Sequence, residues 1–368
     1  MELVELGEVL KYEQPTKYIV ENTNYNDDFK TPVLTAGQSF LLGYTNETEN
    51  IFSKTPVIIF DDFTTASKYV DFSFKVKSSA MKILKAEKDK ADIRFLFYLL
   101  QTIKINNEQH KRYWISKFSK IKILLPPLAE QKRIAAILDE ADKLRRLNQQ
   151  LITKYEQLSQ SLFLEMFGDP VTNPKGWEKN ELISFGRIVT GNTPSRKNQD
   201  NYSSNFIEWI KTDNITLSNI YISKAKEYLS EEGLKSARFV EKGSLLVACI
   251  AGSIKSIGRA ALTDRRVSFN QQINALEPNE NVNSTFLYHL FRNSTEYIQS
   301  HSSKGMKRML SKGSFSKIKM VKPPIELQTQ FAERVGLIEA QKKQAQEALQ
   351  KSEDLFNVLL QKAFKGEL

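Results

Sequence analysis

The sequence predicts an α+β protein in which two strand-rich domains are joined by two long antiparallel helices that form a coiled coil. Three observations predict this fold. A fourteen-residue segment at 118–131 returns at 315–328 with eight identical positions. Each copy is followed by a long stretch with helical spacing of apolar residues, and each is preceded by a large region of short β-forming runs. A repeated scaffold with divergent flanking regions is typical of one architecture that presents two recognition surfaces.

The repeat extends upstream of these segments with a slowly changing offset. Residues 95–99 return at 286–290, which is 191 positions later, and the basic pair at 111–112 returns at 307–308, which is 196 positions later. The offset reaches 197 for the fourteen-residue segment. A duplication followed by small insertions produces such a drift, whereas chance matches would scatter. We therefore expect internal pseudo-two-fold symmetry.

Proline pairs and a breaker-rich linker mark the boundaries of domains and helices. Pro126-Pro127 and Pro323-Pro324 end the strand-rich regions. A helix can begin after each pair, because proline is tolerated in a first helical turn but not further inside. Gly168, Pro170, Pro174 and Gly176 cluster after the first long helical stretch, which indicates a linker. We expect a first domain at 1–125, a first long helix at 126–168, a linker at 169–176, a second domain at 177–322 and a second long helix at 323–368.

Short runs predict individual elements within the two domains. Runs rich in β-formers predict strands at 56–60, 70–76, 244–251, 258–263 and 267–276. Helical spacing predicts short helices at 91–103 and near 283–299. Asp92 stands where an acceptor side chain can cap or charge the start of a helix.

The two long helices are expected to bury heptad seams against each other. The first seam is assigned to positions 137, 141, 144, 148, 151, 155, 158 and 162. The second is assigned to positions 331, 335, 338, 342, 345, 349, 352, 356, 359 and 363. Spacing that alternates four and three residues is the signature of coiled-coil packing. The alternative is that each helix packs separately on its own domain, but an antiparallel return of the second helix along the first satisfies both seams.

Composition indicates a protein with an acidic partner. The 368 residues carry a formal net charge of +10, and the pI is about 9.3, which most simply indicates nucleic acid as the partner. A single cysteine, Cys249, excludes an internal disulfide framework, and its apolar neighbours predict a buried position. No apolar run approaches the ~20 residues that span a bilayer. The N-terminal residues lack the pattern of a signal peptide, so we expect a cytoplasmic protein.

Motifs for catalysis are absent from the sequence. No phosphate-binding loop with Walker spacing and no nucleophile elbow is present. The three histidines, His110, His289 and His301, show no zinc-ligand spacing with one another or with Cys249. Acidic residues form no evident nuclease constellation. We therefore expect no catalytic residues and no metal site, and a binding function.

Several linked segments resemble the specificity subunit of Type I restriction–modification enzymes. They are the segment 125–135 around the first proline pair, the linker 167–177 and the ending 359–368. In addition, 35–45 with 60–70 is similar to one common kind of target-recognition domain in that family, and the Asn-Gln-Gln run at 270–272 is similar to another. The second proline segment departs from the pattern, with Ile325-Glu-Leu-Gln instead of Leu-Ala-Glu-Gln.

The resemblance implies a DNA sequence-recognition subunit without a catalytic site. Each of two target-recognition domains would read one half of a bipartite, asymmetric site in double-stranded DNA. The paired helices would set the gap and dock two methyltransferase subunits, and motor-nuclease subunits would join the full complex. S-adenosylmethionine, ATP and Mg²⁺ would then be held by the partner subunits, with no cofactor on this chain. The alternatives are an autonomous DNA methyltransferase with an unrecognised motif, and a coiled-coil scaffold without a DNA role.

Basic and amide side chains in loops are the candidate DNA contacts, because phosphates require Lys or Arg and base edges favour Arg, Lys, Asn and Gln. The equivalent pairs Lys111-Arg112 and Lys307-Arg308 rank first, because the duplication places both just before a closing strand. The full set of candidates is Gln38, Tyr44, Thr64, Lys68, Tyr69, Lys111, Arg112, Arg196, Lys197, Lys255, Arg259, Gln271, Gln272, Lys307 and Arg308. Each candidate is equally well explained as a solvated surface residue.

Overall fold

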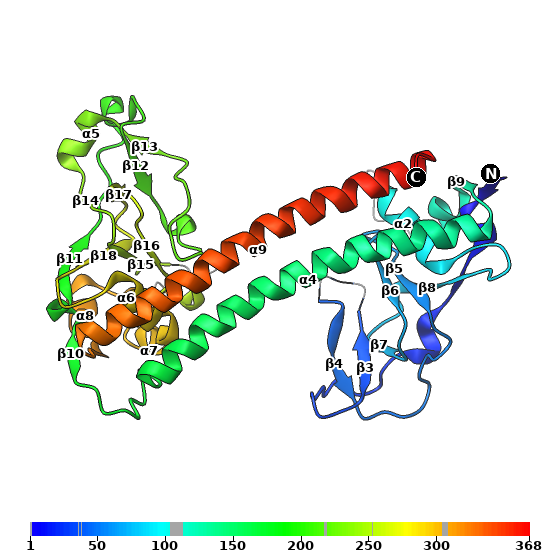
Figure 1. Ribbon diagram of the computed structural model, residues 1–368, viewed down its shortest axis with the longest axis horizontal. Helices are drawn as coiled ribbons and strands as arrows, with labels where there is room; N and C mark the ends of the chain where they lie inside the picture. Colours follow the sequence, from blue (N-terminus) through cyan, green and yellow to red (C-terminus); the bar gives the residue numbers. More distant parts are fainter. Residues whose placement is uncertain are drawn as a thin grey trace. The chain divides into compact units, whose positions relative to one another are not determined.

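A computed structural model describes residues 2–35, 37, 39–103, 113–216, 219–251, 253–303 and 308–368. The chain divides into two compact units. Unit 1 consists of Met1–Gln149 with Gln346–Leu368, and unit 2 consists of Gln150–Ala345. Each unit contains one strand-rich domain and a part of both long helices (Figure 1). The predicted α+β class is confirmed.

Unit 1 is built on a four-stranded sheet with a smaller sheet beside it. Its elements are β1 (Glu2–Glu5), α1 (Leu6–Val9), β2 (Leu10–Glu13), β3 (Thr31–Leu34), β4 (Leu41–Thr45), β5 (Val57–Asp61), β6 (Ser67–Val70), β7 (Lys75–Val76), β8 (Met81–Ala86), α2 (Ile93–Thr102), α3 (Tyr113–Ser116) and β9 (Lys122–Leu125). The main sheet has the order β2-β8-β5-β6, the second sheet has the order β4-β3-β7, and β1 pairs with β9.

Unit 2 repeats this plan. Its elements are β10 (Lys179–Glu181), β11 (Gly186–Thr190), β12 (Ile207–Ile210), β13 (Tyr228–Leu229), α5 (Glu231–Ser236), β14 (Phe239–Val240), β15 (Leu245–Ala248), β16 (Ala260–Leu262), β17 (Val267–Phe269), β18 (Ile273–Pro278), α6 (Ser284–Asn293), α7 (Thr295–Ser300), α8 (Lys312–Ser316) and β19 (Lys319–Val321). The main sheet has the order β11-β18-β15-β16, the second has the order β13-β12-β17-β14, and β10 pairs with β19.

The two domains share one topology although their sequences diverge. In each unit the chain enters the main sheet at an edge, leaves for the second sheet and returns to the centre. The parallel pair β3–β7 of unit 1 has its counterpart in the parallel pair β12–β17 of unit 2. The duplication therefore includes the strand-rich domains as well as the repeated segments.

A buried glutamine in each copy of the repeat makes the same three hydrogen bonds. The Gln131 carboxamide oxygen accepts from the backbone N–H of Asp92 at 2.9 Å, and its nitrogen donates to the carbonyls of Lys90 (3.0 Å) and Pro126 (2.8 Å). Both Gln131 and its equivalent Gln328 are 0% exposed. These bonds fix the start of a short helix to the start of a long helix.

Unit 2 contains the matching arrangement around Gln328. Its carboxamide oxygen accepts from the N–H of Asn283 at 2.9 Å, and its nitrogen donates to the carbonyls of Asn281 (3.3 Å) and Pro323 (2.7 Å). Asn283 also caps α6, as Asp92 caps α2 through the N–H of Phe95. The predicted capping role of Asp92 is therefore confirmed.

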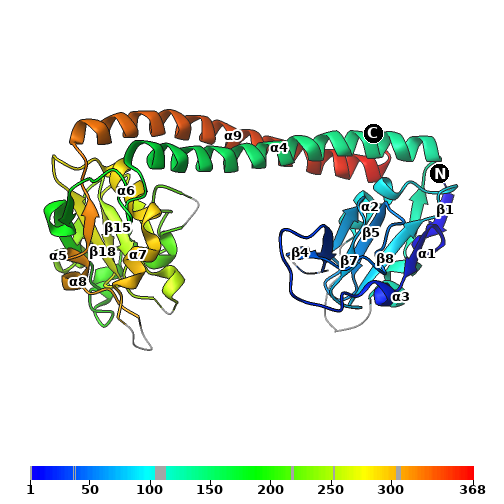
Figure 2. The same cartoon turned by 90° about the horizontal axis from the view of Figure 1, so that it is seen from below.

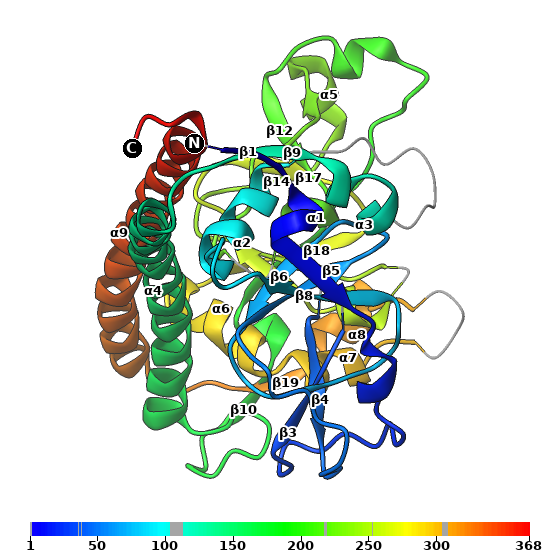
Figure 3. The same cartoon turned by 90° about the vertical axis from the view of Figure 1, so that its right-hand side faces the viewer.

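The long helices are α4 (Leu128–Phe167) and α9 (Ile325–Lys365), and they pair antiparallel within each unit. In unit 1 the Asn148 amide lies 3.3 Å from the Ser352 hydroxyl, and the Arg145 guanidinium lies 4.4 Å from the centre of the Phe356 ring. Residue numbers thus increase along α4 where they decrease along α9, so the two helices are antiparallel. Helix α2 lies between the main sheet of unit 1 and these helices (Figures 2 and 3).

The same antiparallel pairing holds in unit 2. Lys342 lies 3.0 Å from the Glu156 carboxylate. The ring of Phe163 lies 5.6 Å from that of Phe331 and also packs against Phe286 of α6. The two helices therefore do not pack separately on their own domains.

The predicted seam is confirmed for α9 but wrong by one residue along much of α4. Every assigned α9 position is buried or half-buried. On α4, however, Leu144, Leu151 and Leu158 are 45%, 42% and 50% exposed. The adjacent positions 145, 152 and 159 face inward instead. Arg145 reaches this inner position because its long side chain can lie over the Phe356 ring.

Three predicted elements are interrupted in the structure. The run 70–76 is divided between β6 and β7, and the run 267–276 is divided between β17 and β18 by a turn at 270–272. The helix expected near 283–299 is two helices, α6 and α7, which meet at Ser294. In the first two cases the chain passes from one sheet to the other, which alternation alone does not reveal.

The scaffold differs between the units at a half-buried polar contact between α2 and α4. In unit 1 the Tyr98 hydroxyl donates to the Asp139 carboxylate of α4 at 2.6 Å. The repeat offsets of 191 and 197 put His289 and Gly336 at the equivalent places in unit 2. The His289 Nε2 atom is buried and has no hydrogen-bond partner among the described residues. Burial, with the nearby charges of Arg292 and Lys342, lowers the pKa of His289 to about 3.

This lowered pKa predicts that unit 2 is less stable in mild acid. The unfolded chain binds a proton at His289 below about pH 6.5, whereas the folded chain does not until about pH 3. The free energy of unfolding therefore decreases as the pH is lowered from about 6.5 to about 3. At about 1.4 kcal/mol per pH unit, the loss attributable to His289 by pH 5 is roughly 2 kcal/mol. Urea unfolding at pH 7 and pH 5 measures it. His289→Phe should remove this loss, and the exposed-site control His301→Phe should retain it. Equal pH dependence in both variants would contradict the assignment.

Candidate nucleic-acid interface

A turn at one end of the main sheet of unit 1 carries the candidate Thr64. Between β5 and β6, the Asp61 carboxylate accepts from the backbone N–H groups of Phe63 (2.9 Å) and Thr64 (3.3 Å). Thr65 has a positive φ of 62°, a conformation that a tight turn demands. The carboxylate therefore shapes the turn and leaves the Thr64 side chain exposed.

The neighbouring Asp62 ties this turn to the segment that begins at residue 113. Its carboxylate accepts from the N–H of Trp114 at 2.8 Å, and its carbonyl accepts from the N–H of Tyr113 at 3.1 Å. Lys82 lies 3.5 Å from the carboxylate, and both side chains are almost fully buried. A buried carboxylate of this kind is stable only when it is paired and hydrogen-bonded. The chain directly after Lys111-Arg112 is thus held beside the turn that carries Thr64.

Unit 2 brings the equivalent segments together in the same way. The connection between β15 and β16 carries Lys255, which is exposed, and Arg259, which is half-buried. Ile250 forms an antiparallel bridge with Met309, and the N–H of Leu310 donates to the Cys249 carbonyl at 2.8 Å. The exposed Arg308 therefore lies next to this connection. In each unit the same end of the main sheet gathers two of the segments predicted to contact DNA.

The other candidates in unit 1 have different surroundings. Lys68 on β6 is exposed, and Tyr44 on β4 is half-buried. Tyr69 packs under α2, with the Arg94 guanidinium 4.2 Å from the centre of its ring, and burial raises the pKa of its hydroxyl. We assign Tyr69 to the packing of α2 on the sheet. Gln38, Lys111, Arg112 and Lys307 lie outside the described residues.

Arg196 of unit 2 is held within its own domain. Its guanidinium is paired with Glu227 and lies 4.5 Å and 5.1 Å from the ring centres of Tyr202 and Trp209. Lys211 pairs with the same carboxylate, and these bonds lower the pKa of Glu227. Lys197, next in the chain, is exposed.

The two glutamines at the β17–β18 turn have separate roles. Gln271 is exposed and accepts a hydrogen bond from the Thr193 hydroxyl. Gln272 is half-buried, and its side-chain oxygen accepts from the Asn270 amide at 3.0 Å. Its backbone carbonyl also accepts from the N–H of Cys249 at 2.8 Å. Gln271 is therefore available to a ligand, while Gln272 stabilises the turn.

A cationic hollow in unit 2 was not predicted from the sequence. It has a volume of about 720 Å³ and is lined by Arg187, Arg238, Phe239 and Lys312. Arg187 lies on β11, Arg238 directly precedes Phe239 at the start of β14, and Lys312 lies on α8. Arg238 donates to the Thr190 carbonyl at 2.7 Å, and Arg187 pairs with Glu277. Sequence reasoning missed these cations because they are far apart in the chain, and only the strand order brings them together.

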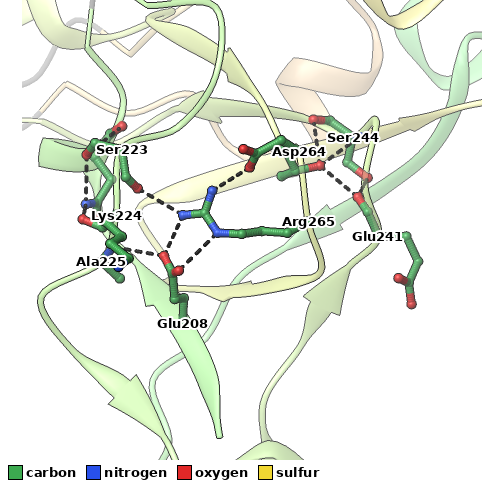
Figure 4. A network of polar contacts seen from close by, with 10 residues as sticks. Glu208, Ser223, Lys224, Ala225, Glu241, Ser244, Asp264 and Arg265 are labelled. Carbon is green, nitrogen blue, oxygen red and sulfur yellow. Dashed lines mark hydrogen bonds and ion pairs between the residues drawn. The ribbon is translucent and has the colours of Figure 1, made fainter. Parts of the chain in front are cut away.

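Arg265 of unit 2 is a cation that serves the fold. Its Nε and Nη2 atoms donate to the two Glu208 oxygens at 3.0 Å and 2.6 Å, and its third nitrogen pairs with Asp264 (Figure 4). Burial tends to raise the pKa of Glu208, but the bonds from Arg265 and from the N–H of Ala225 outweigh it and lower that pKa. The bidentate pair joins β12 to the β16–β17 connection.

The described residues contain no cluster of three or more His, Cys, Asp or Glu side chains that could hold a metal ion. Cys249 is buried as predicted, and burial raises the pKa of its thiol to about 12. Within the described part of the chain, no helix is both long enough and apolar enough to cross a membrane.

Comparison with known proteins agrees with this arrangement of two domains of one topology. The sequence model of the Type I restriction modification DNA specificity domain matches residues 1–157 and 174–350. The Type I restriction enzyme EcoR124I/EcoR124II specificity subunit of Escherichia coli is 35% identical over 307 residues, which cover 79% of this chain and 74% of that protein.

Two further similarities extend over most of the chain. The Type I restriction enzyme HindI specificity subunit of Haemophilus influenzae is 24% identical over 355 residues, covering 88% of this chain and 74% of that protein. The crystal structure of the Type-I restriction-modification system S subunit from M. genitalium matches with a TM-score of 0.63 at 16% identity, over 99% of this chain and 96% of that one. The chain belongs to the Type I restriction modification DNA specificity family.

Proposed function

We propose that this chain is the DNA sequence-recognition subunit of a Type I restriction–modification complex, and that each unit reads one half of a bipartite, asymmetric site. The observation that carries the proposal is that both units present the same end of one sheet topology with different exposed side chains. In unit 1 this end carries Thr64, whereas in unit 2 it carries Lys255 and Arg308. Different side chains on one scaffold suit two different base sequences.

The exposed faces of the long helices support docking of a methyltransferase subunit on each unit. In unit 1 the apolar side chains are Leu144, Leu147, Leu355 and Val358, and in unit 2 they are Leu151, Leu158, Leu164 and Leu337, each at least 40% exposed. Apolar residues at helical spacing on a solvent-facing surface favour a protein partner. In this proposal adenine methylation, S-adenosylmethionine, ATP and Mg²⁺ belong to the methyltransferase and motor-nuclease subunits, and this chain acts in the cytoplasm without a cofactor.

The equivalent basic pairs give the first test of this function. Lys111→Ala with Arg112→Ala should weaken DNA binding through one half-site, and Lys307→Ala with Arg308→Ala through the other. If these side chains contact phosphate, affinity falls for every sequence, and the salt slope shrinks by about one unit per lost contact. Fluorescence anisotropy over a range of salt concentrations measures both effects. The control variant is Lys120→Ala with Lys122→Ala, and a salt dependence unchanged in both test variants would contradict phosphate contact.

The second test concerns the division of labour between subunits. The purified chain should neither bind S-adenosylmethionine in isothermal titration nor methylate DNA, and addition of its cognate methyltransferase subunit should restore adenine methylation. Methyl transfer by the purified chain alone would instead support an autonomous methyltransferase. Absence of binding to random duplex at low salt would support a scaffold without a DNA role.

The third test treats the helix pair as a spacer. Residues 142–148 of α4 and 352–358 of α9 contain the partners Asn148–Ser352 and Arg145–Phe356. Deleting both heptads preserves the seam and shortens each helix by roughly 10 Å at ~1.5 Å per residue. At about 3.4 Å per base pair, the gap between half-sites should contract by about three base pairs.

Genome-wide mapping of methylated adenine measures this gap. The half-site sequences should stay the same, and total activity should fall because the rotation between the readers around the duplex also changes. Deletion of 142–148 alone is the control, and it should damage folding because one seam is then out of register. Methylation at the original gap length in the double deletion would show that the helices do not set the spacing.

A further inference from the structure

Unit 1 contains a lysine-lined cavity away from its candidate DNA edge. It has a volume of about 500 Å³, and Lys54, Lys85, Lys88 and Lys132 line it. Its apolar lining includes Pro56, Ala86, Ala91, Ile93 and Leu128. Thr55 and Asp92 complete the lining, and the Asp92 carboxylate is engaged as the cap of α2. Lys85 is paired with Glu13. Lys54, Lys88 and Lys132 are exposed and have no ion-pair or hydrogen-bond partner among the described residues.

Strand register separates this cavity from the end of the sheet that carries Thr64. In the antiparallel β5–β8 pair, Asp61 lies opposite Met81, so the β5–β6 turn and the start of β8 share one end. The cavity is lined by Pro56 and Ala86, which mark the other end. The five residue-to-residue steps of extended strand from Met81 to Ala86 correspond to about 16 Å. A ligand in the cavity therefore does not occupy the candidate DNA edge.

The charge of this location is not repeated in unit 2. Lys85 on β8 pairs with Glu13 on the edge strand β2, and Glu277 on β18 pairs with Arg187 on the edge strand β11, so neither residue adds an unpaired charge. The matching hydrogen bonds of Gln131 and Gln328 make the carbonyls of Lys90 and Asn281 equivalent. Two residues earlier in each unit stand Lys88 and Asn279, and directly after the glutamines stand Lys132 and Thr329.

Two exposed lysines of the unit 1 cavity, Lys88 and Lys132, thus correspond to the neutral residues Asn279 and Thr329 in unit 2. At these two positions the formal charge is +2 in unit 1 and 0 in unit 2. The backbone around them is the same in topology and in its glutamine hydrogen bonds, so the scaffold does not require the lysines. A feature that the scaffold does not require, and that only one copy carries, indicates a ligand for that copy alone.

We propose that the cavity of unit 1 binds an acidic, leucine-containing segment of a partner protein, and that unit 2 does not bind it. Carboxylates would pair with Lys54, Lys88 and Lys132, while an apolar side chain covers Ala91, Ile93 and Leu128. Duplex DNA fits less well, because a charged phosphate group gains nothing from contact with the apolar lining. The proposal is independent of DNA recognition, and it gives two units of one topology different partners.

The test uses the full chain and a fluorescein-labelled 12-residue peptide of Glu and Leu as the probe. Anisotropy and isothermal titration should show saturable binding of one peptide per chain. The variant Lys54→Gln, Lys88→Gln, Lys132→Gln should weaken binding by at least about tenfold, which corresponds to roughly 1.4 kcal/mol. The corresponding triple Glu variant should weaken it further. A probe with Gln in place of Glu should bind weakly to the unmodified chain.

A matched control separates a specific site from general attraction to a basic protein. Lys30→Gln, Lys120→Gln and Lys122→Gln remove the same charge from exposed positions of unit 1 outside the cavity. The control should bind the peptide as the unmodified chain does. Equal weakening in both variants, or no peptide binding up to about 1 mM, would overturn the proposal.

A measurement of DNA binding distinguishes a peptide site from a site for duplex DNA. The affinity for duplex DNA should be the same in the cavity variant and in the control variant. A greater loss of DNA affinity in the cavity variant, together with displacement of the peptide by duplex, would identify a phosphate site and overturn the proposal. Failure of DNA binding by the unmodified chain would contradict the proposed function and leave the peptide result standing.

Discussion

The buried glutamine of each repeat is the contact on which the arrangement of each unit depends. Gln131 and Gln328 each join three backbone groups: the cap of a short helix, the loop before it and the proline pair before a long helix. An amide is suited to this position because it has both a donor and an acceptor end. Its loss would leave several buried backbone groups without partners, at about 1–3 kcal/mol each. The recognition domain is thereby fixed to the helices at one point in each unit.

A fixed scaffold leaves the far end of each sheet free to vary. The turn beside Thr64 is shaped by Asp61 and Asp62, whereas the equivalent connection in unit 2 is longer and is held by backbone bonds to Cys249 and Leu310. Neither of these two arrangements involves Gln131 or Gln328, the proline pairs or the helix caps. Changes in sequence at the recognition edge therefore need not disturb the contacts that place each domain on its helices.

The sequence predicted those features that local pattern determines. The cap at Asp92 and the α9 seam follow from short-range spacing, and both are observed. The α4 seam was misplaced because leucines recur at 144, 151 and 158, and spacing alone cannot show that the partner helix faces the adjacent Arg145 and Ser159 instead. The hollow that contains Arg187, Arg238 and Lys312 depends on strand order, which spacing does not encode. Among the candidate contacts, Arg196 and Tyr69 looked available but are engaged by partners distant in sequence.

Duplication followed by divergence leaves recognisable differences inside the scaffold itself. The Tyr98–Asp139 contact of unit 1 corresponds in unit 2 to Gly336 and to His289, whose Nε2 atom has no partner among the described residues. Lys88 and Lys132 of the lysine cavity correspond to Asn279 and Thr329. The first difference costs stability in acid and brings no evident surface change, because His289 is buried. The second alters exposed charge at Lys88 and Lys132, which form no ion pair among the described residues. Exposed charge that folding does not require is retained or lost according to what it binds, which is why the lysine cavity, and not the buried histidine, indicates a partner.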